Sequence, residues 1–151
     1  MRKKPTKTSH QKSQPSQDTY SATTNLRRRP LYRTGTCTNI TANHFLFGAD
    51  FGVENLPHSH DYRIEVQLSS ESLDQFGFVF DISMLENLLL SEKEYFEHRL
   101  LNDLPEFSGL NPTVEAFAKI IHTRLGSALR FFEGTMKVIV WENDQAWASF
   151  N

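Results

Sequence analysis

Hydrophobic and polar positions alternate most strictly in "HDYRIEVQLS", residues 60–69. One side of this run carries tyrosine, isoleucine, valine and leucine, and the other side carries polar residues. Because successive side chains of a strand point to opposite faces, the pattern predicts a half-buried strand. The threonine- and aromatic-rich stretch 33–47 predicts an earlier strand that reaches His44, and residues 48–59, with two glycines and a proline, predict a connecting loop.

After the alternating run the pattern becomes helical. "SSESLDQ" predicts a turn, and "FGFVFDI", residues 76–82, predicts the returning strand of a hairpin. Residues 83–101 repeat leucine and phenylalanine at helical spacing, and Ser83 and Glu86 have the spacing of a capping box. A second helix is predicted from Asn111, a favourable N-cap residue, with proline at the first helical position.

The last segment predicts another hairpin. "MKVIVWEN" and "QAWASFN" each read as a strand, and the chain turns around Asn143 and Asp144. The order is then three strands, two helices and two strands. Because strands and helices are segregated along the chain, we predict the α+β class, an antiparallel sheet with two helices on one face.

Charge divides the chain into two parts. Residues 1–36 carry nine basic residues and one acidic residue, a net charge of +8, whereas the remainder has a net charge of −10. Residues 1–33 contain few apolar side chains and much Ser, Thr, Gln, Lys and Pro, so we expect a disordered basic tail. The globular domain is expected to span 34–151. The tail is interpreted as a solvated segment, and its charge leaves nucleic-acid binding open as an alternative.

The single cysteine, Cys37, excludes a disulfide within the chain and a zinc site built from cysteines. It favours a reducing compartment, and we therefore predict a cytoplasmic location. Neither a signal peptide nor a transmembrane run is apparent, so a membrane partner is not expected.

Two histidines stand out because His58 and His60 share one face at the start of the alternating strand. Alternate residues of a strand lie about 6.6–6.8 Å apart, and neighbouring antiparallel strands lie about 4.8 Å apart. His44, at the end of the preceding strand, is therefore the natural third ligand of one metal ion. Three histidines with an open fourth position suit a catalytic zinc site. The alternative is an H-x-H pair that is simply part exposed and part buried.

Six segments carry a resemblance to a known family. They are "NHFLF", "HSHDYRIEVQL", "GFVFDISMLENLL", "EHRLLNDL", "NPTVEAFAKII" and "VIVWEN", in this order. Together they resemble the 6-pyruvoyl-tetrahydropterin synthase family, which includes 6-carboxy-tetrahydropterin synthase, over residues 34–151. The resemblance implies a T-fold (tunnelling fold), whose subunits join their sheets into a trimeric barrel. Two trimers stack into a hexamer, and the active sites lie between subunits.

The resemblance also implies roles for individual residues. The zinc ligands of the family fall on His44, His58 and His60. Glu142, in "VIVWEN", matches the glutamate that binds the pterin's amino and ring N–H groups, and Thr113 belongs to a segment whose backbone contacts the pterin. His98 matches the acid/base histidine of an Asp-His pair, although here Glu97 precedes it.

The chain departs from the family at its general base, because the cysteine expected a few residues before the H-x-H motif is absent. Glu54, four residues before His58, occupies that position. Some relatives use a glutamate in this region and cleave dihydroneopterin to 6-hydroxymethyl-dihydropterin, a folate precursor. Ser59 also replaces the glycine of the family's usual motif.

We therefore expect a zinc-dependent lyase that acts on the side chain of 7,8-dihydroneopterin triphosphate or a related dihydropterin. The product stays open between 6-carboxy-tetrahydropterin, 6-pyruvoyl-tetrahydropterin and 6-hydroxymethyl-dihydropterin, and the pathway between queuosine and folate synthesis. A non-catalytic T-fold protein that binds a pterin is the alternative from another functional class.

Overall fold

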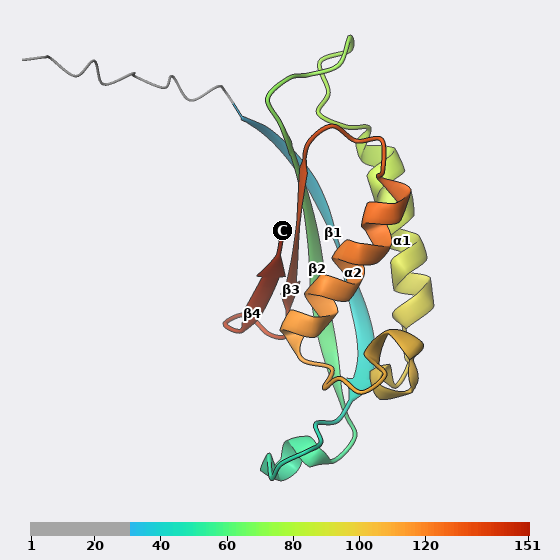
Figure 1. Ribbon diagram of the computed structural model, residues 1–151, viewed down its shortest axis with the longest axis vertical. Helices are drawn as coiled ribbons and strands as arrows, with labels where there is room; N and C mark the ends of the chain where they lie inside the picture. The colour runs from blue at the N-terminus through green and yellow to red at the C-terminus, as the bar shows by residue number, and fades with distance from the viewer. Residues whose placement is uncertain (1–30) are drawn as a thin grey trace, which may run out of the picture.

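The fold is built on one antiparallel sheet, seen edge-on in a computed structural model that describes residues 31–151 (Figure 1). Its strands are β1 (Tyr32–His44), β2 (His58–Ser70), β3 (Thr135–Trp141) and β4 (Trp147–Phe150), in the order β1-β2-β3-β4. The expected basic tail lies outside the described residues except for its last three positions, two of which, Tyr32 and Arg33, belong to β1. None of the helices within 31–151 is long and apolar enough to cross a membrane.

Two helices, α1 (Ile82–Phe96) and α2 (Val114–Ala128), cover one face of the sheet (Figure 1). The core lies between these layers, because the alternating positions of β2 and the apolar stripes of the helices face each other. Its fully buried side chains include Tyr62, Ile64, Val66, Leu68, Leu85, Phe96, Phe117, Ile121, Val138 and Val140. The α+β class and the placement of both helices on one face are confirmed.

The strand predicted for residues 76–82 is wrong. Each side of β2 already pairs with a neighbour, β1 on one side and β3 on the other, so no edge is free for a returning strand. Residues 71–80 instead form turns and bends. The carboxylate of Asp74 accepts hydrogen bonds from the amides of Phe76 and Phe78, both at 2.9 Å, and Gly77 takes a positive φ of 87°.

Both helices begin at caps other than the predicted ones. Asp81 caps α1 by accepting a hydrogen bond from the amide of Ser83, and α1 ends at Phe96 rather than at residue 101. Thr113 caps α2 by accepting a hydrogen bond from the amide of Ala116. Asn111, the predicted N-cap, instead uses its side chain to bind Phe47.

Arg124 joins the two helices to the segment between them. Its Nε donates to Glu92 at 2.5 Å and its Nη1 donates to Glu106 at 2.6 Å, while its guanidinium lies 4.0 Å from the centre of the Tyr95 ring. Burial alone would lower the pKa of Arg124, but the hydrogen bonds and charges of Glu92 and Glu106 raise it above its usual range. Glu106 lies in the short 3-10 helix η3 (Pro105–Phe107), so the network fixes the chain that leads into α2.

Candidate active site

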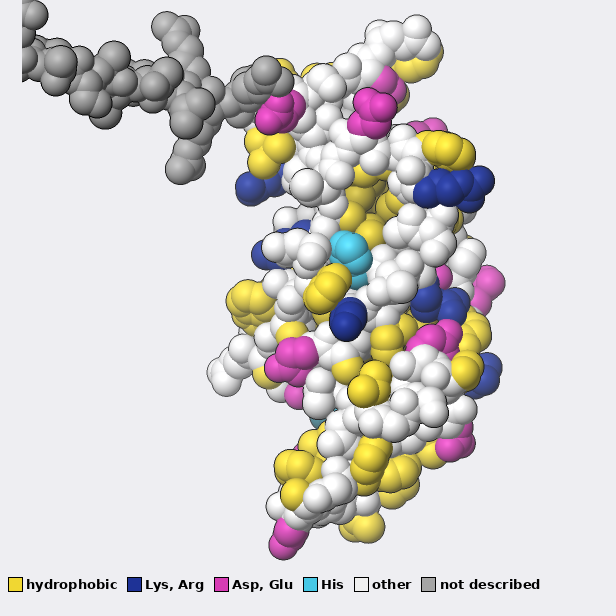
Figure 2. Space-filling model, viewed as in Figure 1, with side chains coloured by type: hydrophobic (Ala, Val, Ile, Leu, Met, Phe, Trp, Pro, Cys, Tyr) yellow, Lys and Arg dark blue, Asp and Glu magenta, His cyan; other side chains and the backbone are white. Residues whose placement is uncertain are grey.

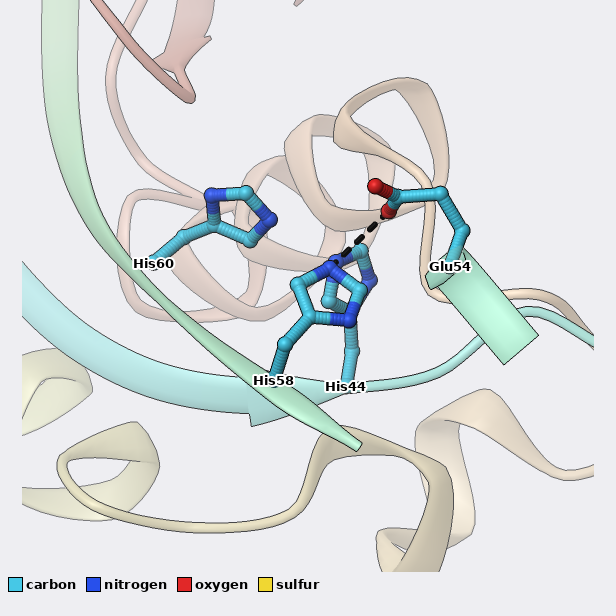
Figure 3. Close-up of side chains that lie close together, drawn as sticks. All are labelled: His44, Glu54, His58 and His60. Carbon is cyan, nitrogen blue, oxygen red and sulfur yellow. Dashed lines mark ion pairs between the residues drawn. The ribbon is translucent and has the colours of Figure 1, made fainter. Parts of the chain in front are cut away.

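The paired ends of β1 and β2 place three histidines together. The register sets His44 directly opposite His58, and His60 lies two residues further along β2 on the same face. The ring centroids are 4.5 Å apart for His44 and His58, 5.0 Å for His44 and His60, and 4.8 Å for His58 and His60. Figure 3 shows the three rings gathered on one side of the hairpin.

Backbone carbonyls orient two of the rings. The Nδ1 of His44 donates to the carbonyl of Pro112 at 2.8 Å, and the Nδ1 of His58 donates to the carbonyl of Leu56 at 2.8 Å. A carbonyl accepts only, so the proton sits on Nδ1 and the Nε2 lone pair of each ring is free. The Nε2 atoms of all three histidines are buried and make no hydrogen bond to any described residue.

Glu54 adds a carboxylate to this cluster. It lies in the 3-10 helix η1 (Gly52–Asn55), within the loop that connects β1 and β2. Its Oε2 lies 2.9 Å from the Nε2 of His58, without the alignment of a hydrogen bond. One ligand atom from each of His44, Glu54, His58 and His60 lies within 4.8 Å of the others.

The donor set fits a zinc ion. Burial lowers the pKa of His44, and the neighbouring His58 and His60 lower it further, against the opposing effects of the Pro112 carbonyl and Glu142. Neutral imidazole is the form that binds a metal ion. Three imidazole nitrogens that make no hydrogen bond within residues 31–151, next to one carboxylate, are the ligand types that zinc takes in catalytic sites.

Glu142 is a second carboxylate beside the cluster. It follows β3 directly and shares the helix-facing side of Val138 and Val140, as period-two alternation requires. Its Oε1 lies 3.3 Å from the Nε2 of His60. Thr113 follows Pro112, whose carbonyl holds His44.

The profile of the 6-pyruvoyl tetrahydropterin synthase family matches residues 34–151, which include every residue of this site. The chain belongs to the 6-pyruvoyl tetrahydropterin synthase family. The resemblance read from the sequence is thereby confirmed, and with it the T-fold of the single subunit.

Named relatives agree with the family assignment. The chain is 30% identical over 99 residues to the 6-carboxy-5,6,7,8-tetrahydropterin synthase of Bacillus subtilis (strain 168), a match that covers 63% of this chain. It is 28% identical over 89 residues to the 6-pyruvoyl tetrahydrobiopterin synthase of Dictyostelium discoideum, covering 58% of this chain. Each match spans 66% of the relative's own length, slightly under two thirds.

Solved structures show the same fold at lower identity. The structure of Caenorhabditis elegans 6-pyruvoyl tetrahydropterin synthase has a TM-score of 0.72 and 24% identity, over 82% of this chain and 96% of that chain. A Plasmodium vivax 6-pyruvoyltetrahydropterin synthase variant has a TM-score of 0.68 and 14% identity, over 80% of this chain and 97% of that chain.

Two of the residues assigned from the family pattern lie apart from the histidines. His98 is a positive-φ residue, at 58°, and its side chain is 77% exposed. Its amide donates to the carbonyl of Thr41 at 2.6 Å, and the carboxylate of Glu97 accepts from the amide of Thr41 at 3.3 Å. The pair therefore sits at the outer edge of β1, with the carboxylate of Glu97 3.8 Å from the Nε2 of His98.

Sequence reasoning missed the asparagines that hold the loop between β1 and β2. The amide groups of Asn102 and Asn111 each make two hydrogen bonds to the backbone, with Phe45 and Phe47 respectively. Asn55 makes three within the loop itself. An asparagine in a loop is common, so the sequence carries no signal that separates these three from a solvated residue.

Proposed function

We propose that the chain is a zinc-dependent lyase that acts on the side chain of 7,8-dihydroneopterin triphosphate or a related dihydropterin. The observation that carries the proposal is the cluster of three buried histidine Nε2 atoms that make no hydrogen bond to residues 31–151 and lie beside two carboxylates, Glu54 and Glu142. The family assignment supports the pterin as the substrate class.

His44, His58 and His60 would hold the zinc. When bound, zinc supplies Lewis-acid chemistry toward an oxygen of the substrate. Glu142 would bind the pterin, because its two carboxylate oxygens can accept parallel hydrogen bonds from an amino group and a ring N–H. The backbone around Thr113 would complete the pterin site from the start of α2.

Glu54 would act as the general base in place of the missing cysteine. A carboxylate is ionised near neutral pH without any tuning, and Glu54 stands next to the ligand histidines. It would remove the proton of a side-chain hydroxyl, and the bond between the carbon of that hydroxyl and the carbon attached to the ring would break, so that the departing fragment leaves as an aldehyde. The electron pair of that bond would pass into the pterin ring system, and a proton would return to the carbon that stays attached to the ring.

This chemistry favours 6-hydroxymethyl-dihydropterin as the product over the 6-pyruvoyl and 6-carboxy compounds. Two observations support the choice. The only cysteine, Cys37, lies on β1 far along the strand from His44, and Glu54 occupies the position beside His58. In the Plasmodium vivax relative, a glutamate is the catalytic residue that the variant replaces with alanine.

His98 would serve a second copy of the chain. Because it is exposed at the edge of β1, it can enter the active site of a neighbouring subunit in the trimer or hexamer that we predict. Apolar side chains exposed on the loop between β1 and β2 favour such contacts. Figure 2 shows this end of the molecule, where Phe47, Phe51, Val53 and Leu56 are exposed.

The cytoplasmic location stays a prediction.

The test is product identification with the purified protein. Zinc-loaded wild type is incubated with 7,8-dihydroneopterin and with its triphosphate, and the products are identified by mass spectrometry. General-base catalysis contributes about 10²–10⁴-fold, so Glu54→Ala should lose that much turnover while its zinc content stays unchanged. If the wild type binds a pterin but turns over none of the dihydropterins, this proposal is wrong. The chain would then be a non-catalytic pterin-binding protein.

A further inference from the structure

The loop between β1 and β2 is held by hydrogen bonds rather than by packing. None of the residues of η1, which carries Glu54, is buried. Val53 is 78% exposed and Leu56 is 67% exposed, so apolar contacts within the subunit do not fix this turn. The position of the Glu54 carboxylate therefore depends on the polar contacts of the loop.

Asn55 makes the densest set of these contacts. Its Nδ2 donates to the carbonyl of Leu46 at 2.8 Å and to the carbonyl of Ala49 at 3.0 Å, and its Oδ1 accepts from the amide of Phe51 at 2.8 Å. Both donor hydrogens and the acceptor oxygen of the side chain are used. One side chain thus joins the start of the loop, its middle and the turn that carries Glu54.

The backbone of Glu54 is hydrogen-bonded to residues of the same loop. The amide of Leu46 donates to the carbonyl of Glu54 at 2.7 Å, and the amide of Glu54 donates to the carbonyl of Phe51 at 3.4 Å. Leu46 and Phe51 are two of the three residues that Asn55 binds. Removing the Asn55 side chain should therefore loosen both residues that bind the backbone of Glu54.

The carboxylate itself has little else to orient it. Glu54 is 43% exposed, and among residues 31–151 only His58 pairs with its side chain. From these contacts we propose that Asn55 is a positioning residue, which holds Glu54 against the histidine cluster through the turn. The inference rests on the proposed function, with Glu54 as general base. Figure 3 shows Glu54 reaching the histidines from the loop rather than from a strand.

The test compares Asn55→Ala with wild type in turnover and in backbone exchange. A misplacement of about 1 Å costs up to about 100-fold in rate, so kcat should fall by about 10- to 100-fold while KM and zinc content stay within about twofold. Because Asn55 acts through Glu54, the same substitution in a Glu54→Gln background should change the residual rate by less than about twofold. Asp74→Ala is the matched control, since it removes two hydrogen bonds that loop amides donate to a side-chain carboxylate, beyond the other end of β2.

Hydrogen–deuterium exchange of the zinc-loaded protein tests the role of Asn55 without a measurement of enzyme activity. Asn55→Ala should raise deuterium uptake in residues 46–56 and leave the strands unchanged. Equal uptake in variant and wild type would overturn the proposal, as would a kcat loss that persists undiminished in the Glu54→Gln background. Absence of turnover in wild type would refute the proposed function instead, and the exchange result would still decide whether Asn55 holds the turn.

Discussion

Replacing Arg124 with methionine should destabilise the domain more than any ordinary surface substitution. Methionine keeps much of the packing against Tyr95 but removes the charge that compensates Glu92 and Glu106. The Glu92 side chain is only 11% exposed, and that of Glu106 is 22% exposed. Two carboxylates would then face each other with little water to separate their charges.

The size of the expected stability loss follows from the burial of the Arg124 network. Breaking a buried ion pair by removing one partner costs about 3–5 kcal/mol. The Arg124 side chain is 29% exposed, which places this network at the low end, about 3 kcal/mol. For a domain of this size, about 4 °C of melting temperature corresponds to each kcal/mol, so the midpoint should fall by roughly 12 °C.

Urea unfolding followed by circular dichroism, at one fixed protein concentration, measures the free energy of unfolding. Arg130→Met is the matched control, because Arg130 is exposed and its guanidinium lies over an aromatic ring, 4.6 Å from the centre of Phe131. A loss of less than about 1 kcal/mol, the range of exposed pairs, would refute the reasoning.

Three further predictions concern the site and the assembly. Protein purified without added metal should hold one zinc per chain, and His58→Ala should lose it by elemental analysis; unchanged zinc would place the site elsewhere. Glu142→Gln should weaken pterin binding about ten- to a hundredfold by titration while zinc stays bound, because loss of a charged acceptor costs about 1.5–3 kcal/mol; equal affinity would mean that Glu142 does not contact the pterin. Light scattering should report a trimer or hexamer, because closure of a barrel pairs the open edges of β1 and β4, and a monomer at micromolar concentration would contradict this.

The sequence predicts the sheet best where one face is buried. Residues 60–69 alternate without exception, and β2 has the expected faces. The pattern fails at residues 76–82. Aromatic residues near a glycine resemble a strand in sequence, whether or not a neighbouring strand has a free edge for them to pair with. Only the order of strands shows that both sides of β2 are taken, and that order depends on contacts between segments far apart in the chain.

The residues of the candidate site also differ in how far the sequence alone predicts them. The same-side spacing of His58 and His60, with His44 ending the neighbouring strand, is enough to predict the histidine cluster. Glu142 and Glu54 enter through the family resemblance, since nothing in their spacing alone points to a site. The role of Asn55 depends on the path of an irregular loop, which hydrophobic periodicity does not describe.

The clustered histidines and the proposed base belong to different kinds of structure. His44, His58 and His60 are fixed by the ladder of β1 and β2, whereas Glu54 is carried by the loop that the ladder closes. A substitution, insertion or deletion within residues 46–57 can therefore exchange the base and leave the histidine cluster in place. Such a hairpin lets reaction outcome diverge among descendants of one ancestor without passing through a form that has lost its histidine cluster.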